Sequence, residues 1–385
     1  MHLISGRALR SEGLRAWSNS SVHWVRRAVV VAPPGDDADR DVKEKELSVS
    51  ELVSGRLRIA RDLAGLTQAA LARDIEVSPA AVSQFEGGAA HPSPSTLTRL
   101  AEALDVPEPF LVRPLIDTHE GFFRSLRRTA VSARRHARAV AHVAHDVALH
   151  AADGGLLVAH AVPRIDLQLD ASVREIEETA GVVREAWAIP TGPVGDIVGL
   201  LEQHGVTVIR LPLSTAAVDA FSLPFADHPV VVLGADKNDR ARSRFDGVHE
   251  LGHLVIHGEQ IWGLKEVEYQ AHAFAAAFLM PAAEIRDELP NSVDWSRLFE
   301  LKRHWQVSLA ALLRRARDLG RMTPSTYLTA VKAASARGWR RSEPVPLGTP
   351  EQPRFLNRYL DTVAGQSTRE FLPAHVLTEI ANATR

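Results

Sequence analysis

Two histidines and a glutamate, His249, Glu250 and His253, stand at a spacing that suits a metal ion. On a helix, residues i and i+4 lie one above the other on the same face, so both imidazoles can reach one zinc ion. Glu250 follows the first histidine and can reach a zinc-bound water instead. Zinc lowers the pKa of that water, and the glutamate accepts its proton as the water attacks a carbonyl. The three residues therefore predict a hydrolytic zinc site.

The surroundings of this motif indicate a buried helix. Apolar residues occupy the faces that the ligands leave free: Phe245, Leu251, Leu254 and Val255. Ionisable groups on such a helix are tolerable only with a metal or a partner. Upstream, the β-branched runs 206–209 and 230–233 can form a short sheet beneath it.

A third protein ligand is needed, because catalytic zinc takes three and leaves its fourth position to water. The following helical segment offers Glu266, Glu268 and His272. Its buried stripe is expected to be Ala271, Phe274, Ala275 and Phe278. Glu268 lies three residues before the first of these and can lean toward the same side. The pattern therefore favours Glu268 over Glu266.

A second pattern, nearer the N-terminus, predicts two short helices joined by a turn. Thr67 can cap the first helix, whose apolar residues recur at helical spacing. Ser78 can cap the second, with Pro79 at its first position, where a missing N–H does no harm. Gly87-Gly88 ends that helix. Small residues at the crossing let the two helices pack closely: Ala69, Ala72 and Ala81.

The outer face of the second helix would then be free to enter a DNA major groove. The stretch 67–88 resembles the phage-repressor (XRE) type of helix–turn–helix. This resemblance implies that Gln68 contacts a DNA phosphate and that Ser78, Ala80 and Gln84 lie at the base edges. We expect the DNA-binding residues to be Thr67, Gln68, Ser78, Ala80, Ser83 and Gln84.

The charge of this segment argues for weak DNA binding by the segment alone. Residues 51–113 hold six arginines and eight acidic residues, and phosphate neutralisation supplies most non-specific affinity. A homodimer on two half-sites would help. The next helix can also supply charge, through Arg124, Arg127, Arg128, Arg134, Arg135 and Arg138. A solvated basic face is an equal alternative. The histidines of that helix are not expected to bind a metal, because no carboxylate of the helix completes a set.

Several blocks in the second half of the chain resemble the ImmA/IrrE family of metallopeptidases. They are 219–222, 244–258 and 268–281, followed by 301–320 and 338–344, which resemble the later part of long members with an N-terminal XRE domain. The resemblance implies that His249, His253 and Glu268 bind zinc and that Glu250 is the catalytic base. It also implies a protein substrate, typically a partner repressor cut once to derepress genes after stress or in mobile elements.

Two histidines near the motif need separate interpretation. The family usually has asparagine at the position of His272, which is here either a fourth ligand or a proton donor to the tetrahedral intermediate. His257 falls four residues after His253 and just before a glycine. We interpret it as a structural cap at the helix end.

Composition excludes several classes of protein. The 385 residues include 45 Lys+Arg and 47 Asp+Glu, for a formal net charge of −2, which excludes binding to nucleic acid by bulk positive charge. The chain has no cysteine, so disulfides, thiol nucleophiles and cysteine-bound metals are excluded. No apolar run approaches the ~20 residues of a membrane helix. We expect a cytoplasmic protein without a membrane partner.

The expected fold is mainly α with a small α+β part. A five-helix helix–turn–helix bundle would precede a zincin-like domain, made of a short sheet and the motif helix, and a helical C-terminal region. The expected divisions are a weakly ordered extension (1–49), the DNA-binding domain (50–113), a long basic connecting helix (114–160), the metallopeptidase domain (161–290), a helical subdomain (291–345) and a tail with short helices (346–385).

These features predict a transcriptional regulator that binds a double-stranded DNA operator and uses Zn²⁺ to hydrolyse a peptide bond in a partner protein, most simply a repressor. One alternative is a repressor or antitoxin-type regulator whose peptidase-like domain is a non-catalytic sensor or dimerisation module. Another is an antitoxin-type protein whose C-terminal part holds a toxin.

Overall fold

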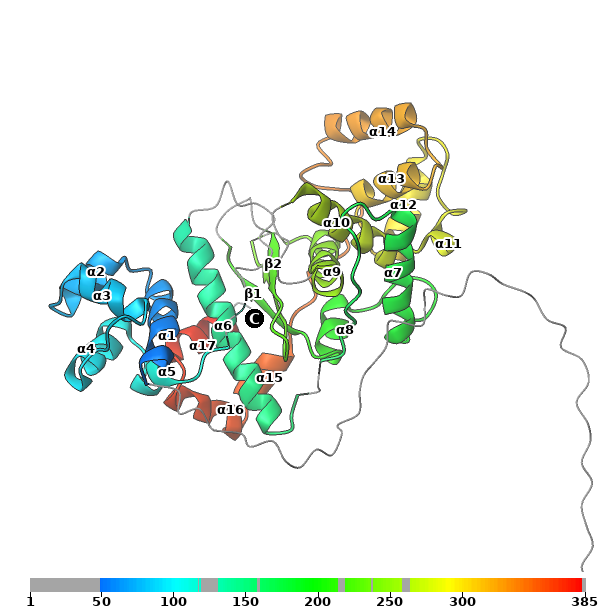
Figure 1. Cartoon of the computed structure of the whole chain (residues 1–385). Helices are drawn as coiled ribbons and strands as arrows, with labels where there is room; N and C mark the ends of the chain where they lie inside the picture. Colours follow the sequence, from blue (N-terminus) through cyan, green and yellow to red (C-terminus); the bar gives the residue numbers. More distant parts are fainter. Residues whose placement is uncertain are drawn as a thin grey trace, which may run out of the picture. The chain divides into compact units, whose positions relative to one another are not determined.

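The computed structural model describes residues 49–116, 118, 131–157, 160–213, 219–236, 238–257 and 264–382 (Figure 1). The extension expected over 1–49 lies outside these ranges except for its last residue, as do Arg124, Arg127 and Arg128. Within the described ranges, no helix is both long and apolar enough to cross a membrane.

The first part of the chain forms the five-helix bundle that the sequence predicts. Its helices are α1 (Val49–Leu63), α2 (Gln68–Asp74), α3 (Pro79–Glu86), α4 (Pro94–Leu104) and α5 (Glu108–Val112). The hydroxyls of Thr67 and Ser78 accept backbone N–H groups at the starts of α2 and α3, as expected. The bundle closes around fully buried apolar side chains, among them Leu57, Leu71, Val82, Leu100 and Phe110.

The connecting helix is described from Val131 to Asp153 as α6. It packs against α1 on one side and against strands β1 and β3 on the other (Figure 1). Twelve of its residues are buried, from Ala137 to Ala151. Most of this length is therefore a core helix, and a solvated basic face fits only its first turns. At its centre the buried Asp146 pairs with Arg56 of α1 through oxygen–nitrogen contacts of 2.5 and 2.8 Å.

A three-stranded sheet follows, in the order β1-β3-β2. β1 (Thr207–Leu211) pairs in parallel with β3 (Val230–Gly234), and β2 (Ala220–Leu223) pairs antiparallel with the other side of β3. Successive side chains point to opposite faces. Val230 and Val232 accordingly join the core that contains α6, whereas Val231 and Leu233 join the core that contains the motif helix.

The helices that contribute to that second core include α7 (Val173–Ala186), α8 (Ile197–Gln203), α9 (Arg240–Ile256) and α10 (Lys265–Leu279). α9 carries the histidine motif and packs closely on α10. Gly252 permits this approach, because a Cβ there would lie 3.0 Å from the Phe274 ring and 3.3 Å from the Ala271 backbone. The third ligand candidate on α10 is thereby brought opposite the motif.

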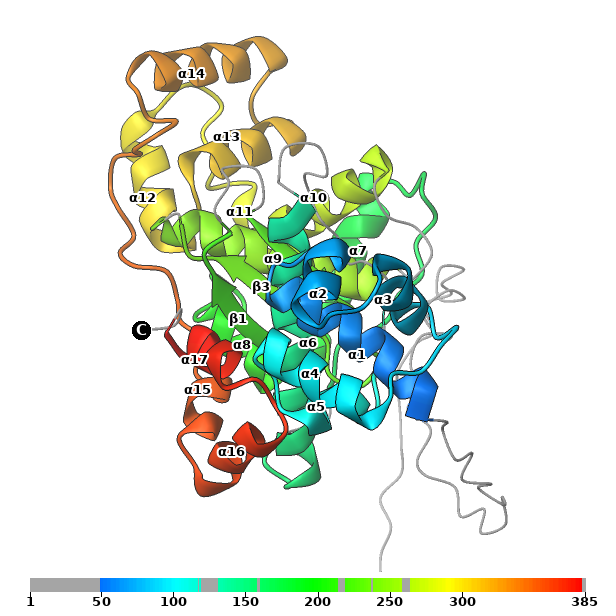
Figure 2. The same ribbon diagram turned by 90° about the vertical axis from the view of Figure 1, so that its left-hand side faces the viewer.

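The chain then forms the helices α11 (Ala282–Ile285), α12 (Trp295–Trp305), α13 (Leu309–Asp318) and α14 (Pro324–Ala336). It ends in α15 (Phe355–Leu360), α16 (Val363–Ser367), a 3-10 turn (Thr368–Glu370) and α17 (Ala374–Asn382). α15 and α17 pack on α6 and β1 (Figure 2). Leu356, Leu372 and Ile380 are buried in the core shared with α6. The described part of the segment expected as a tail thus belongs to the folded body.

Candidate functional site

α9 places the motif in the interior. Asp239 caps its first turn by accepting the N–H of Arg242, and the helix runs for 17 residues without a break. His249, Glu250 and His253 are each 1% exposed. Three ionisable groups at this depth are costly unless they meet a metal or hydrogen-bonding partners.

His249, His253 and Glu268 converge on one point between α9 and α10. The two Nε2 atoms lie 3.1 Å apart. The Glu268 carboxylate oxygens lie 3.5 Å from Nε2 of His249 and 3.7 Å from Nε2 of His253. Tetrahedral zinc, with bonds of about 2.0–2.1 Å, sets its ligand atoms about 3.3 Å apart. These two nitrogens and one oxygen have the chemistry and the spacing to hold a metal ion.

The other ligand candidates lie outside this group. Glu266 is exposed, whereas Glu268 is partly buried on the α9 side of the same helix. The His272 ring lies with its centroid 6.5 Å from that of His249 and rests against Phe245. Among the described residues, only His249, His253 and Glu268 form a set of metal-binding spacing. His272 therefore lies beside the set without belonging to it, and this geometry does not favour His272 as a fourth ligand.

Glu250 turns away from the histidine pair toward the sheet. Its Oε2 accepts a hydrogen bond from the Ser222 hydroxyl, 2.7 Å away. Ser222 lies on β2 and is fully buried. The sequence marked 219–222 only through the family resemblance and assigned no role to Ser222. A lone hydroxyl in the apolar strand Ala220-Phe221-Ser222-Leu223 was the available signal.

His257 is the C-cap residue of α9, as expected, and its N–H donates to the carbonyl of His253. Its ring has a second role that the sequence did not predict. Nδ1 lies 3.0 Å from Nδ1 of His253, and Nε2 lies 3.1 Å from Oε1 of Gln270. Burial lowers the pKa of His257 to about 4.

The helix–turn–helix exposes three of the residues expected to face DNA. Ala80, Ser83 and Gln84 are exposed on α3. The Gln68 amide donates to Glu86 over 2.8 Å. Glu86 in turn holds the Arg61 guanidinium, and this ties the start of α2 to the end of α3 and to α1.

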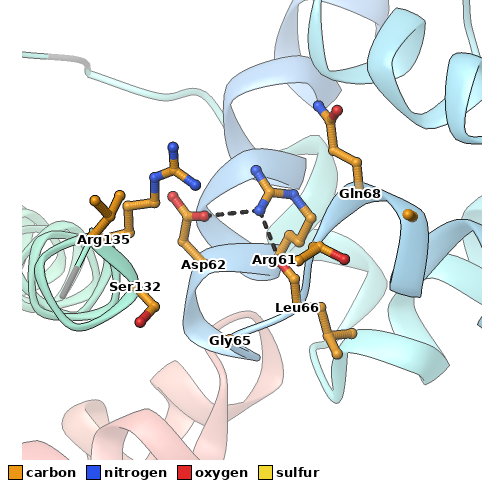
Figure 3. Close-up of a pocket in the computed structure, with 10 residues that line it drawn as sticks. Arg61, Asp62, Gly65, Leu66, Gln68, Ser132 and Arg135 are labelled. Atoms are coloured by element: carbon orange, nitrogen blue, oxygen red, sulfur yellow. Dashed lines mark hydrogen bonds and ion pairs between the residues drawn. The ribbon is translucent and has the colours of Figure 1, made fainter.

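A cavity of about 510 Å³ lies beside Gln68, between the end of α1, the segment 65–69 that leads into α2, and the first turns of α6 (Figure 3). Arg61 pairs with Asp62 over 3.1 Å on its wall. Arg135 extends from α6 toward the same carboxylate and is exposed. Burial raises the pKa of Asp62, against the opposing effect of these two arginines. The first turns of α6 thus bring a cation next to the helix–turn–helix.

Comparison with known protein families gives two matches. Residues 201–317 match the model of the IrrE N-terminal-like domain, a peptidase family, and residues 53–111 match the model of a helix-turn-helix domain. No curated protein matches the chain. The first match contains the His-His-Glu group, and the second contains α2 and α3. The chain therefore contains a region similar to helix-turn-helix domains, followed by a region similar to the IrrE N-terminal-like peptidase domain.

Proposed function

We propose that this protein is a DNA-binding regulator whose α9–α10 site binds zinc and hydrolyses a peptide bond in a partner protein. The convergence of His249, His253 and Glu268, with Glu250 beside them, is the observation that carries the proposal. The three ligands leave one position of a tetrahedral ion for water, which is the arrangement of catalytic zinc.

A zinc ion held by His249, His253 and Glu268 would supply a water of lowered pKa and would polarise the scissile carbonyl. Glu250 is the general base. Its Oε2 accepts the Ser222 hydroxyl, and this hydrogen bond would orient the carboxylate for proton transfer. Glu250 then passes the proton to the departing amine. His272, partly buried beside His249, would donate a hydrogen bond to the substrate oxygen as negative charge develops.

The proposed DNA partner is bound by the outer face of α3 and by the start of α2, through Thr67, Gln68, Ser78, Ala80, Ser83 and Gln84. Thr67 and Ser78 serve by capping, since both hydroxyls already accept backbone N–H groups. Exposed Gln84 is the longest polar side chain of α3 that can reach a base edge. Arg135 of α6 adds a cation for the backbone beside Gln68. A homodimer would occupy two half-sites, and a DNA partner agrees with the expected cytoplasmic location.

The domain limits that we propose follow the predicted ones, with one addition. Residues 346–382 support the zincin-like domain, because the Glu351 carboxylate binds Arg244 of α9 and accepts the N–H of Ile197 at the start of α8. A buried carboxylate that joins a helix start to a buried arginine is costly to remove. Truncation before 351 is therefore expected to disturb α9.

The experiment that tests the proposed function compares the wild type with Glu250→Gln on a repressor encoded beside the gene. Both proteins are first loaded with zinc and checked for metal content. The expected result is a single cleavage by the wild type and none by Glu250→Gln, with equal zinc in both. Zinc in both proteins and cleavage by neither would favour the alternative, in which the domain is a non-catalytic sensor.

A further inference from the structure

A chain of buried hydrogen bonds runs from the metal-facing histidines to the backbone before α7. It passes from His253 to His257 over 3.0 Å and from His257 to Gln270 over 3.1 Å. The Gln270 amide nitrogen then reaches the carbonyls of Gln168 at 2.7 Å and Leu169 at 3.2 Å. All three side chains are 5% exposed or less. Each contact has the length of a normal hydrogen bond, so each needs one donor and one acceptor.

The two backbone carbonyls determine which group donates and which accepts in each of these hydrogen bonds. A carbonyl can only accept, so the group that faces Gln168 and Leu169 must be the NH₂ of Gln270. The amide oxygen of Gln270 therefore faces His257, and that oxygen can only accept. Nε2 of His257 must then carry a proton and donate it to Gln270.

The proton on Nε2 of His257 also decides the role of the other ring nitrogen, Nδ1. A neutral imidazole protonated at Nε2 has a bare Nδ1, which can only accept. The neutral form is the expected one, because the ring is only 5% exposed and a cation there would be poorly solvated. Nδ1 of His253 must then carry the proton that it donates to His257. This leaves Nε2 of His253 with its lone pair directed toward His249 and Glu268.

We propose that His257 and Gln270 are positioning residues that fix His253 in the tautomer required for metal binding. The backbone at 168–169, about 80 residues before the motif in sequence, accepts the last hydrogen bond and so fixes the direction of the others. The proposal rests on the proposed zinc site. Partners of this kind fix the orientation and tautomer of a liganding histidine, and their loss typically costs about 10–100-fold in metal affinity.

The experiment measures zinc affinity by chelator competition in the full chain. His257→Phe keeps a ring of similar size but removes both nitrogens, and zinc affinity should fall about 10–100-fold. His257→Gln is the matched rescue, because its oxygen can accept from His253 and its NH₂ can donate to Gln270. It should bind zinc at least tenfold more tightly than His257→Phe. Equal affinity of wild type and His257→Phe, or of the two variants, would overturn the proposal.

A spectroscopic measurement reads the tautomers directly. In metal-free protein labelled with ¹⁵N-histidine, two-bond ¹H–¹⁵N correlations should show His253 protonated at Nδ1 and His257 protonated at Nε2. A His253 ring protonated at Nε2 instead would contradict the proposed series of hydrogen bonds from His253 through His257 to Gln270. The two proposals can fail separately. If the wild type binds no zinc, the proposed zinc site is wrong. The tautomers measured in the metal-free protein still test the role of His257 and Gln270.

Discussion

Ser222 on edge strand β2 donates a hydrogen bond to Glu250 on α9 across 2.7 Å, and both side chains are almost fully buried. The bond joins the sheet to the proposed general base. It holds one carboxylate oxygen and would orient the group for proton transfer. It also stabilises the ionised form of the carboxylate, which is the form that a base requires.

Replacement of Ser222 by alanine is therefore expected to slow peptide cleavage without loss of the metal. A hydrogen bond to a charged group contributes about 1.5–3 kcal/mol, which corresponds to about 10–100-fold in kcat/KM. The measurement is steady-state cleavage of the partner protein, together with zinc content. Unchanged kcat/KM, or parallel loss of zinc and activity, would show that Ser222 does not act through Glu250.

Gly252 is expected to control the distance between α9 and α10. In Gly252→Ala the new methyl group meets Phe274 at 3.0 Å and the Ala271 backbone at 3.3 Å. Overpacking of this kind costs about 1–3 kcal/mol. The displaced Glu268 should also bind zinc more weakly.

Gly181 provides the matched control for this substitution, since it lies inside α7 and a Cβ there would meet nothing within 4 Å. Gly181→Ala should be neutral or should stabilise by up to about 1 kcal/mol, the helix preference of alanine. Urea unfolding of both variants compares them. Equal stability of the two variants would contradict the packing argument at Gly252.

DNA binding is expected to separate into base recognition and backbone contact. Gln84→Ala should cost about 1–3 kcal/mol on the operator and relax sequence preference. Arg135→Ala should weaken binding to all sequences alike and lower the slope of log K against log salt by about one. Arg174 of α7 is the control, because it is highly exposed and pairs with Glu178 on its own helix.

Fluorescence anisotropy at several salt concentrations measures both effects. An Arg135→Ala protein with the salt slope of the wild type would remove α6 from the proposed DNA interface. An Arg174→Ala protein that loses as much slope as Arg135→Ala would assign the effect to general charge. Neither result would alter the assignment of Gln84.

Stability should fall in mild acid because of His142 in the core of α6. Burial lowers the pKa of His142 well below its usual 6.5, and the neighbouring Arg138 and Arg56 act in the same direction. The unfolded chain therefore binds more protons than the folded chain as pH falls below about 6.5, and the free energy of unfolding decreases. Each extra proton contributes up to about 1.4 kcal/mol per pH unit.

His142→Phe should flatten this dependence, because phenylalanine cannot take up a proton and can pack against Phe225, which His142 already contacts edge-on. Urea unfolding at pH 5, 6 and 7 gives the slope for both proteins. The same slope in His142→Phe as in the wild type would assign the acid sensitivity to other groups.

The sequence predicted local features well. Spacing alone placed His249 and His253 on one helix face, and capping residues located α2 and α3. Glu268 was favoured over Glu266 from the apolar stripe of its helix, and only Glu268 lies within reach of both histidines. Each of these inferences depends on residues within a few turns of one helix, where periodicity is informative.

The missed features depend on contacts between distant segments. Ser222 meets Glu250 only because β2 lies at the sheet edge beside α9, and a four-residue strand has little periodicity to reveal it. Gln270 became a partner of His257 through the close packing at Gly252. Arg56 and Asp146 are 90 residues apart, so the sequence near either residue does not predict that the two form an ion pair. No local pattern encodes such pairings.

The most direct test of the zinc site is the metal content of the purified chain and of two glutamate variants. Glu268→Gln removes a charged ligand oxygen, whereas Glu266→Gln changes an exposed glutamate two residues away on the same helix. Elemental analysis after equilibration with a zinc buffer should find one zinc per chain in the wild type and in Glu266→Gln, and much less in Glu268→Gln. A wild-type chain without zinc, or equal zinc in both variants, would contradict the proposed site.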